Sequence, residues 1–480
     1  MTHTDLRLED RLRAALPADA DYASARHMVE RGSSLAVRNG VVEPSSTSHD
    51  EGVMFVVWRD GGVGYGATSD LSDEGLRAAV EYAEAWATRT RGRIVGEGVP
   101  LLHTVGEYST PVEESFDSLD LVDQIALLVD ADAALDGGGD GRIVDRSASL
   151  VRYDTQSMLL TNGGGRVVQD IHLVFPSLRA TANEGSNTQS RTYGRAAYAG
   201  QGGVEVLERH GFGDAPVTLA AEAIALLDAP NCPSGSMDLI LAPDQMVLQI
   251  HESIGHPLEL DRILGDERNY AGTSFVTPEM FGTYHYGSEL LNVTFDPTVA
   301  GQVASYAFDD DGTPAERTHL IRDGVLQQPM GGTISQARSG LDGVANSRAS
   351  GWNRPAIDRM ANLNVEPGDS TVTELIAGVE HGVLMQTNVS WSIDDSRNKF
   401  QFGTELGRVI ENGELGHIVR NPNYRGISAT FWRNLTGVAD DFTVMAVGNC
   451  GKGEPNQQIR AGHAAPHCRF ADVEVFGGEQ

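Results

Sequence analysis

One short segment of the sequence has residue types and a spacing that could do chemistry: His251-Glu252-Ser253-Ile254-Gly255-His256. Two neutral imidazoles can hold a divalent metal ion, and a carboxylate beside them can take a proton from water. In the HExxH motif of metalloproteases the two histidines are four residues apart, so they share one face of a helix. Here the histidines are five residues apart, which separates them by about 140° on a regular helix.

A regular helix would not aim both side chains at one ion, so we expect an irregular helix end at Gly255 and His256. Gly255 is permissive, Pro257 disfavours helical geometry at the residue before it, and a π-type turn would also help. The alternative is a solvated helix end that binds no metal. The apolar residues within 246–250 favour the metal site, because they would bury this helix, and buried His and Glu side chains need partners.

Two histidines leave the ion short of a protein ligand, and the sequence offers cysteines. Cys450 follows a strand-like run in FTVMAVGNCGKG, where a thiolate would suit zinc as third ligand, with water in the fourth position. Cys468 competes with it, because His463 and His467 are its neighbours in the sequence. Cys232 lies in a linker and is the weakest candidate. Chemistry alone leaves Cys450 and Cys468 equally open.

The elements that must position these residues follow from periodicity and turn signals. Strand-like runs with Gly-containing turns indicate antiparallel sheets, and a strand at 237–242 leads through Pro243 into the helix that carries the motif. The segment 229–236 holds two prolines, a glycine and two serines, and is the best domain boundary. We expect helices at 5–15, 70–92, 121–135, 202–211, 217–228 and 371–382, and strands at 34–43, 52–68 and within 143–182.

The composition excludes several functions. The chain has 480 residues and a formal net charge of −31, which argues against nucleic acid or an anionic membrane as a direct partner. Its 55 glycines point to many turns and a β-rich chain. Three cysteines form no disulfide framework, and the acidic N-terminal segment is unlike a signal peptide. We therefore expect a cytoplasmic protein with reduced thiols.

Other segments that could be mistaken for binding sites are expected to be structural. The glycine-rich runs at 62–67, 136–141 and 162–165 lack the strand–GxGxxG–helix context and the lysine of phosphate loops, so we expect hairpin turns. The acidic run at 309–314 is expected to cap a tight turn. His319, His381 and His417 are expected to be surface or structural residues, although one of them could polarise a substrate carbonyl.

Taken together, these features resemble the TldD branch of the TldD/PmbA family of metallopeptidases. The resemblance covers nearly the whole chain. The matching segments are VRNGVVE (37–43), DGGVGYGATSDLS (60–72), HESIGHPLELDRI (251–263), DDDGTPAERTHLIRDGVL (309–326), RPAIDRMANLNVEPGD (354–369), NKFQFGTELGRVIENGE (398–414) and VGNCGKGEPNQ (447–457).

The resemblance implies an α+β fold of two domains, built on long, largely antiparallel curved sheets with flanking helices. The expected domains are 1–228 and 237–480. It also implies that His251, His256 and Cys450 bind the metal, with Zn²⁺ as the expected ion, and that Glu252 is the general base. TldD-like subunits usually pair with a TldE (PmbA)-like subunit that lacks the motif, so we expect a heterodimer, with a homodimer as the alternative. The expected substrate is an extended or unfolded peptide, held by strand addition.

Two departures from the family pattern concern the substrate and the end of the chain. Ala361 and Leu363 stand where many relatives have threonine, which affects substrate preference. His463, His467 and Cys468 stand where a plainer strand is expected, which leaves open a second metal site or a redox role for Cys468. Two alternative functions remain: a pathway-specific hydrolase of a peptide-like metabolite, and a non-catalytic subunit that binds peptide without cutting it.

Overall fold

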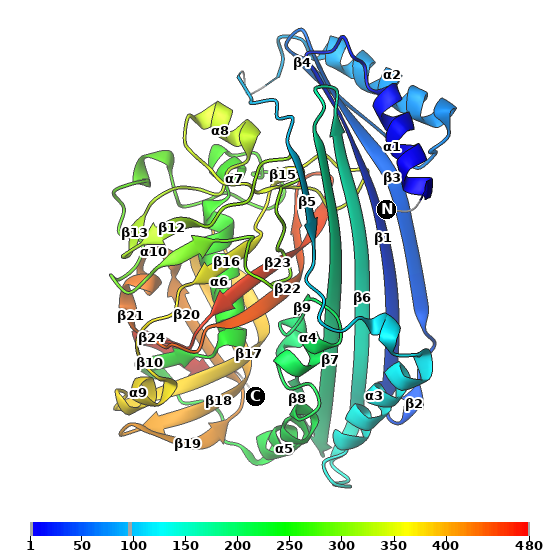
Figure 1. Cartoon of the computed structure of the whole chain (residues 1–480). Helices are drawn as coiled ribbons and strands as arrows, with labels where there is room; N and C mark the ends of the chain where they lie inside the picture. Colours follow the sequence, from blue (N-terminus) through cyan, green and yellow to red (C-terminus); the bar gives the residue numbers. More distant parts are fainter. Residues whose placement is uncertain (1–2, 95–97, 479–480) are drawn as a thin grey trace.

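The computed structural model describes residues 3–94 and 98–478. Its N-terminal half is dominated by a long twisted sheet that stands beside the C-terminal half along most of the molecule (Figure 1). The nine-stranded sheet has the order β4-β3-β1-β6-β7-β5, with β2, β8 and β9 paired at its margins. Its strands are β1 Tyr22–Arg38, β2 Val41–Val42, β3 Ser46–Arg59, β4 Gly62–Thr68, β5 Val105–Ser109, β6 Ile143–Thr161, β7 Arg166–Glu184, β8 Asn187–Thr192 and β9 Gly200–Gln201.

The N-terminal helices pack against this sheet, and most of the predicted ones are confirmed. They are α1 His3–Ala15, α2 Asp73–Arg89, α3 Leu121–Ala134, α4 Glu205–Arg209 and α5 Ala215–Asp228. The predictions at 70–92 and 202–211 were too long. Helix α2 begins at Asp73 because the Ser72 side chain caps it by accepting a hydrogen bond from the backbone N–H of Gly75.

The glycines of the first hairpins have two different uses. Asn39-Gly40 and Asp60-Gly61 have positive φ at both residues, as primed hairpin turns require, which confirms that glycine-containing turns join these strand-like runs. The run at 62–67 forms strand β4, as the strand prediction over 52–68 indicated, so the expectation of a turn at 62–67 was wrong. A Cβ at Gly62, Gly64 or Gly66 would lie 1.9–2.0 Å from backbone carbonyl oxygens of α2. These glycines therefore let the helix lie directly on the strand.

The C-terminal half contains two main sheets. A seven-stranded sheet has the order β10-β17-β18-β20-β24-β21 with β19 paired to β18, and a six-stranded sheet has the order β13-β12-β11-β16-β23-β22. The strands are β10 Gly235–Leu241, β11 Val293–Phe295, β12 Thr318–Arg322, β13 Val325–Leu326, β16 Asn362–Val365, β17 His381–Ile393, β18 Lys399–Glu411, β19 Glu414–Val419, β20 Pro422–Ile427, β21 Leu435–Val438, β22 Thr443–Lys452, β23 Gln457–Ala465 and β24 Cys468–Gly477; β14 Ser347–Arg348 and β15 Ile357–Asp358 form a small separate pair.

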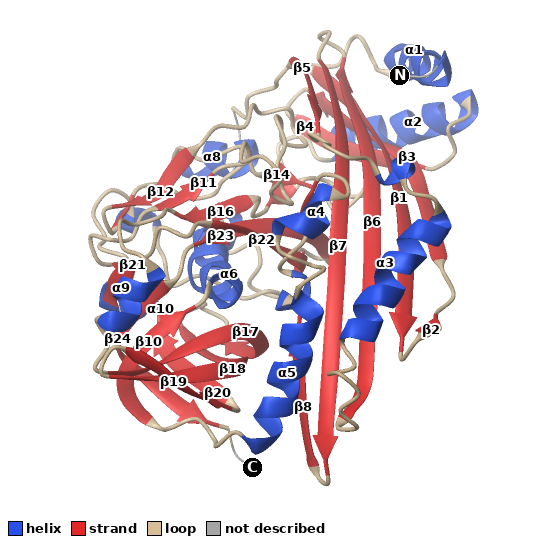
Figure 2. Cartoon of the chain, turned by 60° about the horizontal axis from the view of Figure 1, so that its bottom comes forward, coloured by secondary structure: helices blue, strands red, loops and turns tan. Residues whose placement is uncertain are grey.

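Helices of the C-terminal half are short, and α6 is at its centre. They are α6 Pro243–Ile250, α7 Leu260–Leu264, α8 Thr333–Ser339, α9 Val372–Ala377 and α10 Ser428–Phe431. The prediction at 371–382 was wrong beyond Ala377, because the chain turns there and enters β17. The main apolar core joins Met246 and Ile250 of α6 to side chains of both sheets, including Ile459 and Phe470. Figure 2 shows α6 between the strands of this half.

The predicted α+β class is confirmed, with long and mostly antiparallel curved sheets. Parallel pairing occurs at β5–β7, β10–β17 and β16–β23. Every strand of the nine-stranded sheet ends before residue 202, and every strand of the other sheets begins after residue 234. We retain the division into 1–228 and 237–480 as a proposal. None of the helices in the described part of the chain is long and apolar enough to cross a membrane.

Candidate metal centre

The HESIGH motif continues α6 as a π-helical turn. The turn spans His251–Gly255, and the backbone N–H of His256 donates to the carbonyl oxygen of His251. This hydrogen bond joins the two histidines themselves. In the π-turn, the residue five positions after His251 therefore takes the place that the residue four positions after it would take in a regular α-helix. The imidazole centroids are 4.7 Å apart. Irregular geometry was predicted at Gly255 and His256, but it begins earlier, at His251.

Neighbouring side chains hold this turn in place. The backbone carbonyl of Ser253 accepts a hydrogen bond from the Tyr286 hydroxyl, and the Ser253 hydroxyl accepts one from Trp432 Nε1 at 2.9 Å. Gly255 is required for close packing, because a Cβ there would lie 2.1 Å from the sulfur of Met360. The sequence therefore stabilises the wide turn through buried partners as well as through glycine.

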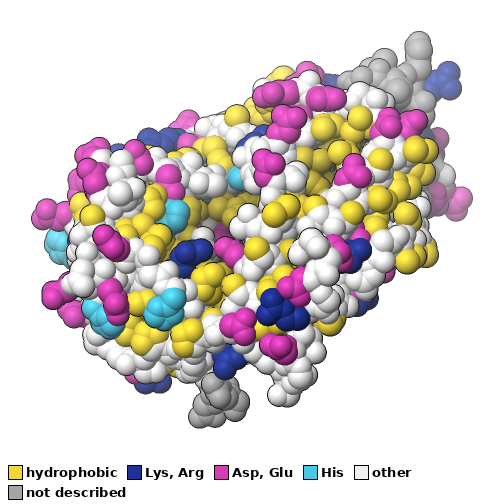
Figure 3. Space-filling model, turned by 90° about the horizontal axis from the view of Figure 1, so that it is seen from below, with side chains coloured by type: hydrophobic (Ala, Val, Ile, Leu, Met, Phe, Trp, Pro, Cys, Tyr) yellow, Lys and Arg dark blue, Asp and Glu magenta, His cyan; other side chains and the backbone are white. Residues whose placement is uncertain are grey.

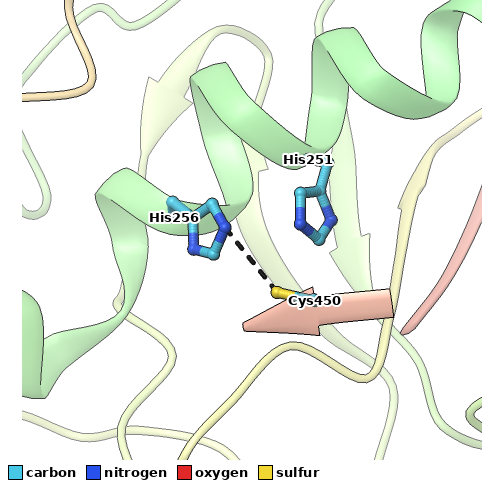
Figure 4. A group of neighbouring side chains, drawn as sticks. All are labelled: His251, His256 and Cys450. Carbon is cyan, nitrogen blue, oxygen red and sulfur yellow. Dashed lines mark hydrogen bonds between the residues drawn. The ribbon is translucent and has the colours of Figure 1, made fainter. Parts of the chain in front are cut away.

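Cys450 reaches the histidines from β22 (Figure 4). Its Sγ lies 3.7 Å from Nε2 of His256. His251, His256 and Cys450 are all buried, and one ligand atom from each lies within 4.8 Å of the others. In the described residues, this is the one group of three or more His, Cys, Asp or Glu side chains close enough to hold a metal ion.

A β-bulge aims Cys450 at this site. Val447 pairs with Ala461 on β23, whereas Cys450 pairs with Ile459, so β22 has one extra residue between the two pairs. Without that residue, Asn449 would oppose Ile459 and Cys450 would point to the other face of the sheet. The structure thus separates the two candidate cysteines. Cys468 lies on β24, where its Sγ contacts the carbonyl of Pro466.

The environments of the three thiols differ. Burial opposes ionisation of Cys450, but His256 and the Arg359 guanidinium outweigh it, so the pKa of this thiol lies below its usual value. Burial raises the pKa of Cys468, and it raises that of Cys232 to about 12. Cys450 is therefore the cysteine best suited to bind a metal as thiolate.

Glu252 lies beside the histidines and forms an ion pair with Arg397. Arg397 Nη1 is 2.7 Å from Glu252 Oε2, and Nη2 donates to the carbonyl of Ala271 at 3.0 Å. Burial raises the pKa of Glu252, but the combined effect of the two histidines and Arg397 is larger, so the pKa lies below its usual value. Arg397 lies in the turn between β17 and β18 with φ of +62°, a conformation that costs a non-glycine residue about 1–3 kcal/mol.

A second layer of buried side chains contacts the histidines. His256 Nδ1 lies 2.9 Å from Glu259 Oε2, and Glu259 is 3.4 Å from both the Lys452 amine and the Arg262 guanidinium. Burial alone would raise the pKa of Glu259, but Lys452 and His256 lower it well below its usual value. On the other side, His251 Nδ1 lies 2.8 Å from His463 Nε2.

These supporting residues could not be identified from the sequence. Only Glu259 lies close to the motif in sequence, three residues after His256, so its contact with His256 was the one that local spacing could suggest. Arg397 and His463 are more than 140 residues from the motif. His463 had been noted only as a neighbour of Cys468. His467 instead pairs with Asp441 at 2.6 Å.

The remaining sequence predictions concern three histidines and an acidic turn that lie away from the His251, His256 and Cys450 cluster. His381 and His417 are exposed, and His319 is half-buried beside Arg322, so these three are surface or structural, as expected. The Asp309 carboxylate accepts hydrogen bonds from the backbone N–H groups of Asp311 and Thr313, which confirms the predicted turn at 309–314.

A cavity of about 650 Å³ lies between the long sheet and the C-terminal half. Gly448 and Asn449, the residues directly before Cys450, line it, whereas the two histidines do not. Its walls also include Tyr153 and Phe175 from the long sheet and Arg460 from β23. The cavity therefore borders the candidate metal centre at the bulge of β22.

Comparisons with known proteins agree with this architecture. The family model described as the PmbA/TldA metallopeptidase C-terminal domain matches residues 234–477, and the model for domain 1 of the same family matches residues 23–87. The chain is 28% identical over 459 residues to a metalloprotease from Methanothermobacter thermautotrophicus, covering 95% of this chain and 96% of that protein. It is 24% identical over 471 residues to a metalloprotease TldD homolog from Haemophilus influenzae, covering 95% and 93%.

A third relative and two solved structures extend these comparisons. A zinc metalloprotease TldD homolog from Saccharolobus solfataricus is 26% identical over 245 residues, which is 51% of this chain and 52% of that protein. A proposed modulator of a DNA gyrase from Thermotoga maritima superposes with a TM-score of 0.75 at 18% identity, covering 98% of this chain and 100% of that one. TldE from Thermococcus kodakarensis superposes with a TM-score of 0.73 at 15% identity, covering 99% and 100%. Two family models over most of the C-terminal half and part of the N-terminal sheet show that the chain belongs to the TldD/PmbA family of metallopeptidases.

Proposed function

We propose that the chain is the metal-bearing subunit of a TldD-type peptidase, which hydrolyses amide bonds of extended or unfolded peptides. One observation carries the proposal: His251, His256 and Cys450 converge in a buried cluster with Glu252 beside them. The naming of relatives as metalloproteases supports the same reaction class.

The donor set fits Zn²⁺. Zinc takes imidazole nitrogen at about 2.0–2.1 Å and thiolate sulfur at about 2.3 Å, so a nitrogen and a sulfur on one tetrahedral ion are about 3.6 Å apart. The separation of 3.7 Å between His256 Nε2 and Cys450 Sγ agrees with that value. Three protein ligands leave one position for water or substrate, as in catalytic zinc sites. The name of the Saccharolobus relative also supports zinc.

Each residue of the site has a distinct role in the proposed reaction. When bound, the metal would supply a Lewis acid that polarises the scissile carbonyl and acidifies water. Glu252 accepts the proton of the attacking water and returns it to the leaving amine. Arg397 holds the Glu252 carboxylate in position before substrate arrives.

The cavity beside β22 is the proposed substrate site. It borders Cys450 through Gly448 and Asn449 of β22. Strand β22 is the last strand of its sheet, so its outer edge could pair with an extended peptide. On the face that Figure 3 shows, acidic side chains are scattered and the basic side chains form no large patch. Together with the net charge of −31, this supports a peptide and not a nucleic acid as partner. By analogy with the family, we propose a TldE/PmbA-like partner subunit, with a homodimer as the alternative outcome of co-purification.

Metal content and cleavage test the proposal together. We expect the purified chain, alone or with its partner subunit, to hold about one zinc ion per chain and to cleave unstructured peptides. Glu252→Gln should keep the metal and lose cleavage. A metal content below about 0.1 per chain, where a catalytic zinc site requires one, would favour a non-catalytic subunit. Full activity of Glu252→Gln would refute the assignment of the general base. Cleavage of one metabolite-like amide, with no cleavage of peptides, would favour a pathway-specific hydrolase.

A further inference from the structure

His463 is a fully buried histidine that contacts the proposed metal site without belonging to it. It lies on β23 and has an exposed fraction of 0%. Its Nε2 is 2.8 Å from Nδ1 of His251, and its own Nδ1 is 3.0 Å from the carbonyl oxygen of Leu363. Both ring nitrogens therefore have a partner.

We propose that His463 is a positioning residue that fixes the tautomer and ring orientation of His251, so that Nε2 of His251 is free to bind the metal. This inference rests on the proposed metal site and names a residue that supports it. Metal-binding histidines usually donate their second ring N–H to an acceptor that sets the ring orientation.

The hydrogen-bond partners determine the tautomers. The Leu363 carbonyl can only accept, so the proton of His463 is on Nδ1. A neutral His463 then has a bare Nε2, which can only accept, and the donor facing it is Nδ1–H of His251. That places the lone pair of His251 on Nε2. The backbone carbonyl of Leu363 thus fixes the tautomer of His463, and His463 in turn fixes the tautomer of His251.

The sheet makes this arrangement rigid. His463 pairs with Leu363 of β16 in parallel register and with Met445 of β22 in antiparallel register. Side chains alternate along a strand, so Ile459 and His463 lie on the same face of β23. Cys450 pairs with Ile459 and shares that face. One sheet therefore presents both a proposed ligand and the positioning residue to the π-turn.

The two histidine ligands receive different support. His256 faces the Glu259 carboxylate, which is balanced by Lys452 and Arg262. His251 faces a neutral imidazole. The site already holds the Glu252 carboxylate and the Cys450 thiol, and a further buried anion without a cation would be costly. A neutral acceptor orients His251 without adding that charge.

Two variants of similar size test the hydrogen bond. His463→Leu fills the space but offers no acceptor, whereas His463→Gln offers an amide oxygen to His251 and an amide N–H to Leu363. His467→Gln is the matched control, because His467 lies four residues away and pairs with Asp441 instead. Zinc affinity would be measured by competition with a chromophoric chelator, and thermal unfolding of the metal-free proteins would report on folding.

We expect His463→Leu to lose about 10–100-fold in zinc affinity. His463→Gln should recover most of it, and His467→Gln should match the wild type. The Co²⁺-substituted His463→Leu protein should also show an altered ligand-field spectrum. Wild-type affinity in His463→Leu, or equal losses in both His463 variants, would overturn the inference. A wild-type chain without zinc affinity would overturn the proposed function and this inference with it.

If His463→Leu does not fold, the wild-type protein still provides a test. ¹⁵N NMR of the histidine rings should find the proton on Nδ1 in both His251 and His463, with the His463 signals identified by their loss in His463→Gln. A proton on Nε2 of His251 would overturn the inference.

Discussion

Gly255→Ala tests whether close packing against the π-turn sets the spacing of the two histidines. The new Cβ would lie 2.1 Å from the sulfur of Met360, whereas ordinary contact begins at 3.4 Å, so one group must move by at least 1.3 Å. Met360 is fully buried, and its backbone carbonyl accepts a hydrogen bond from Arg348, which restricts the movement of the chain there.

The expected cost follows from two opposing effects. Overpacking a well-packed core costs about 1–3 kcal/mol, and replacing glycine by alanine in a helix gains up to about 1 kcal/mol. We expect a net loss of about 1–2 kcal/mol in the free energy of unfolding, from the balance of those two effects. Zinc affinity should also fall, because Gly255 directly precedes His256, one of the proposed ligands.

Chemical denaturation of the metal-free protein, together with chelator competition, measures both effects. Gly213→Ala is the control, because a Cβ there meets no atom within 4 Å and φ is not positive. Met360→Ala should relieve the clash, so the double variant with Gly255→Ala should show a favourable coupling energy of about 0.5–3 kcal/mol. Unchanged stability and zinc affinity in Gly255→Ala, or a coupling energy of zero, would refute the reasoning.

Three further predictions concern the ligands, the base and the pH dependence of stability. Cys450→Ser should abolish stoichiometric zinc binding while Cys468→Ser keeps it; metal analysis decides, and the reverse result would reassign the third ligand. Arg397→Gln should keep zinc but reduce peptide cleavage by about tenfold or more, because the base loses its fixed position; an unchanged cleavage rate would show that Arg397 serves the fold alone. Burial and then Arg209 lower the pKa of His210 from 6.5 to about 4, so between these values the unfolded chain binds the proton and the folded chain does not. Stability should therefore fall as pH decreases through this window, and the pH slope should be smaller in His210→Gln; an identical slope in the two proteins would contradict the shift.

The parts of the fold that follow local rules could be predicted from the sequence. Asn39-Gly40 and Asp60-Gly61 specify their own turns. Helix α2 was predicted in the right place but too long, and Ser72 caps its actual start. Strand β4 lies within the run predicted as strand at 52–68, whereas the expectation of a turn at 62–67 was wrong. The close packing of its glycines depends on α2, which comes later in the chain. The helix prediction after Ala377 failed for a similar reason, since pairing of β17 with β10 and β18 overrides local propensity.

The candidate site was predictable only where its members are adjacent in sequence. His251, Glu252 and His256 form a recognisable motif. The chemistry of the residues left Cys450 and Cys468 equally open, and only the family resemblance favoured Cys450, because the position of this thiol depends on a bulge that the sequence of β22 does not reveal. Arg397 and His463 approach the motif through tertiary contacts, so no pattern of spacing could identify them. Their roles follow from the atoms they face.

The two elements that carry the proposed metal ligands, the π-turn and strand β22, share one structural feature. The motif has one residue more between its histidines than a regular helix allows, and the π-turn absorbs it with a hydrogen bond from His256 to His251. Strand β22 has one residue more than β23 opposite it, and the bulge before Cys450 absorbs it. In a regular α-helix, His256 would point away from the face that carries His251, and in a regular strand, Cys450 would point to the opposite face of the sheet. Because each irregularity re-aims a single ligand, the geometry of the cluster depends on both, and loss of either should disrupt metal binding before it disrupts the fold.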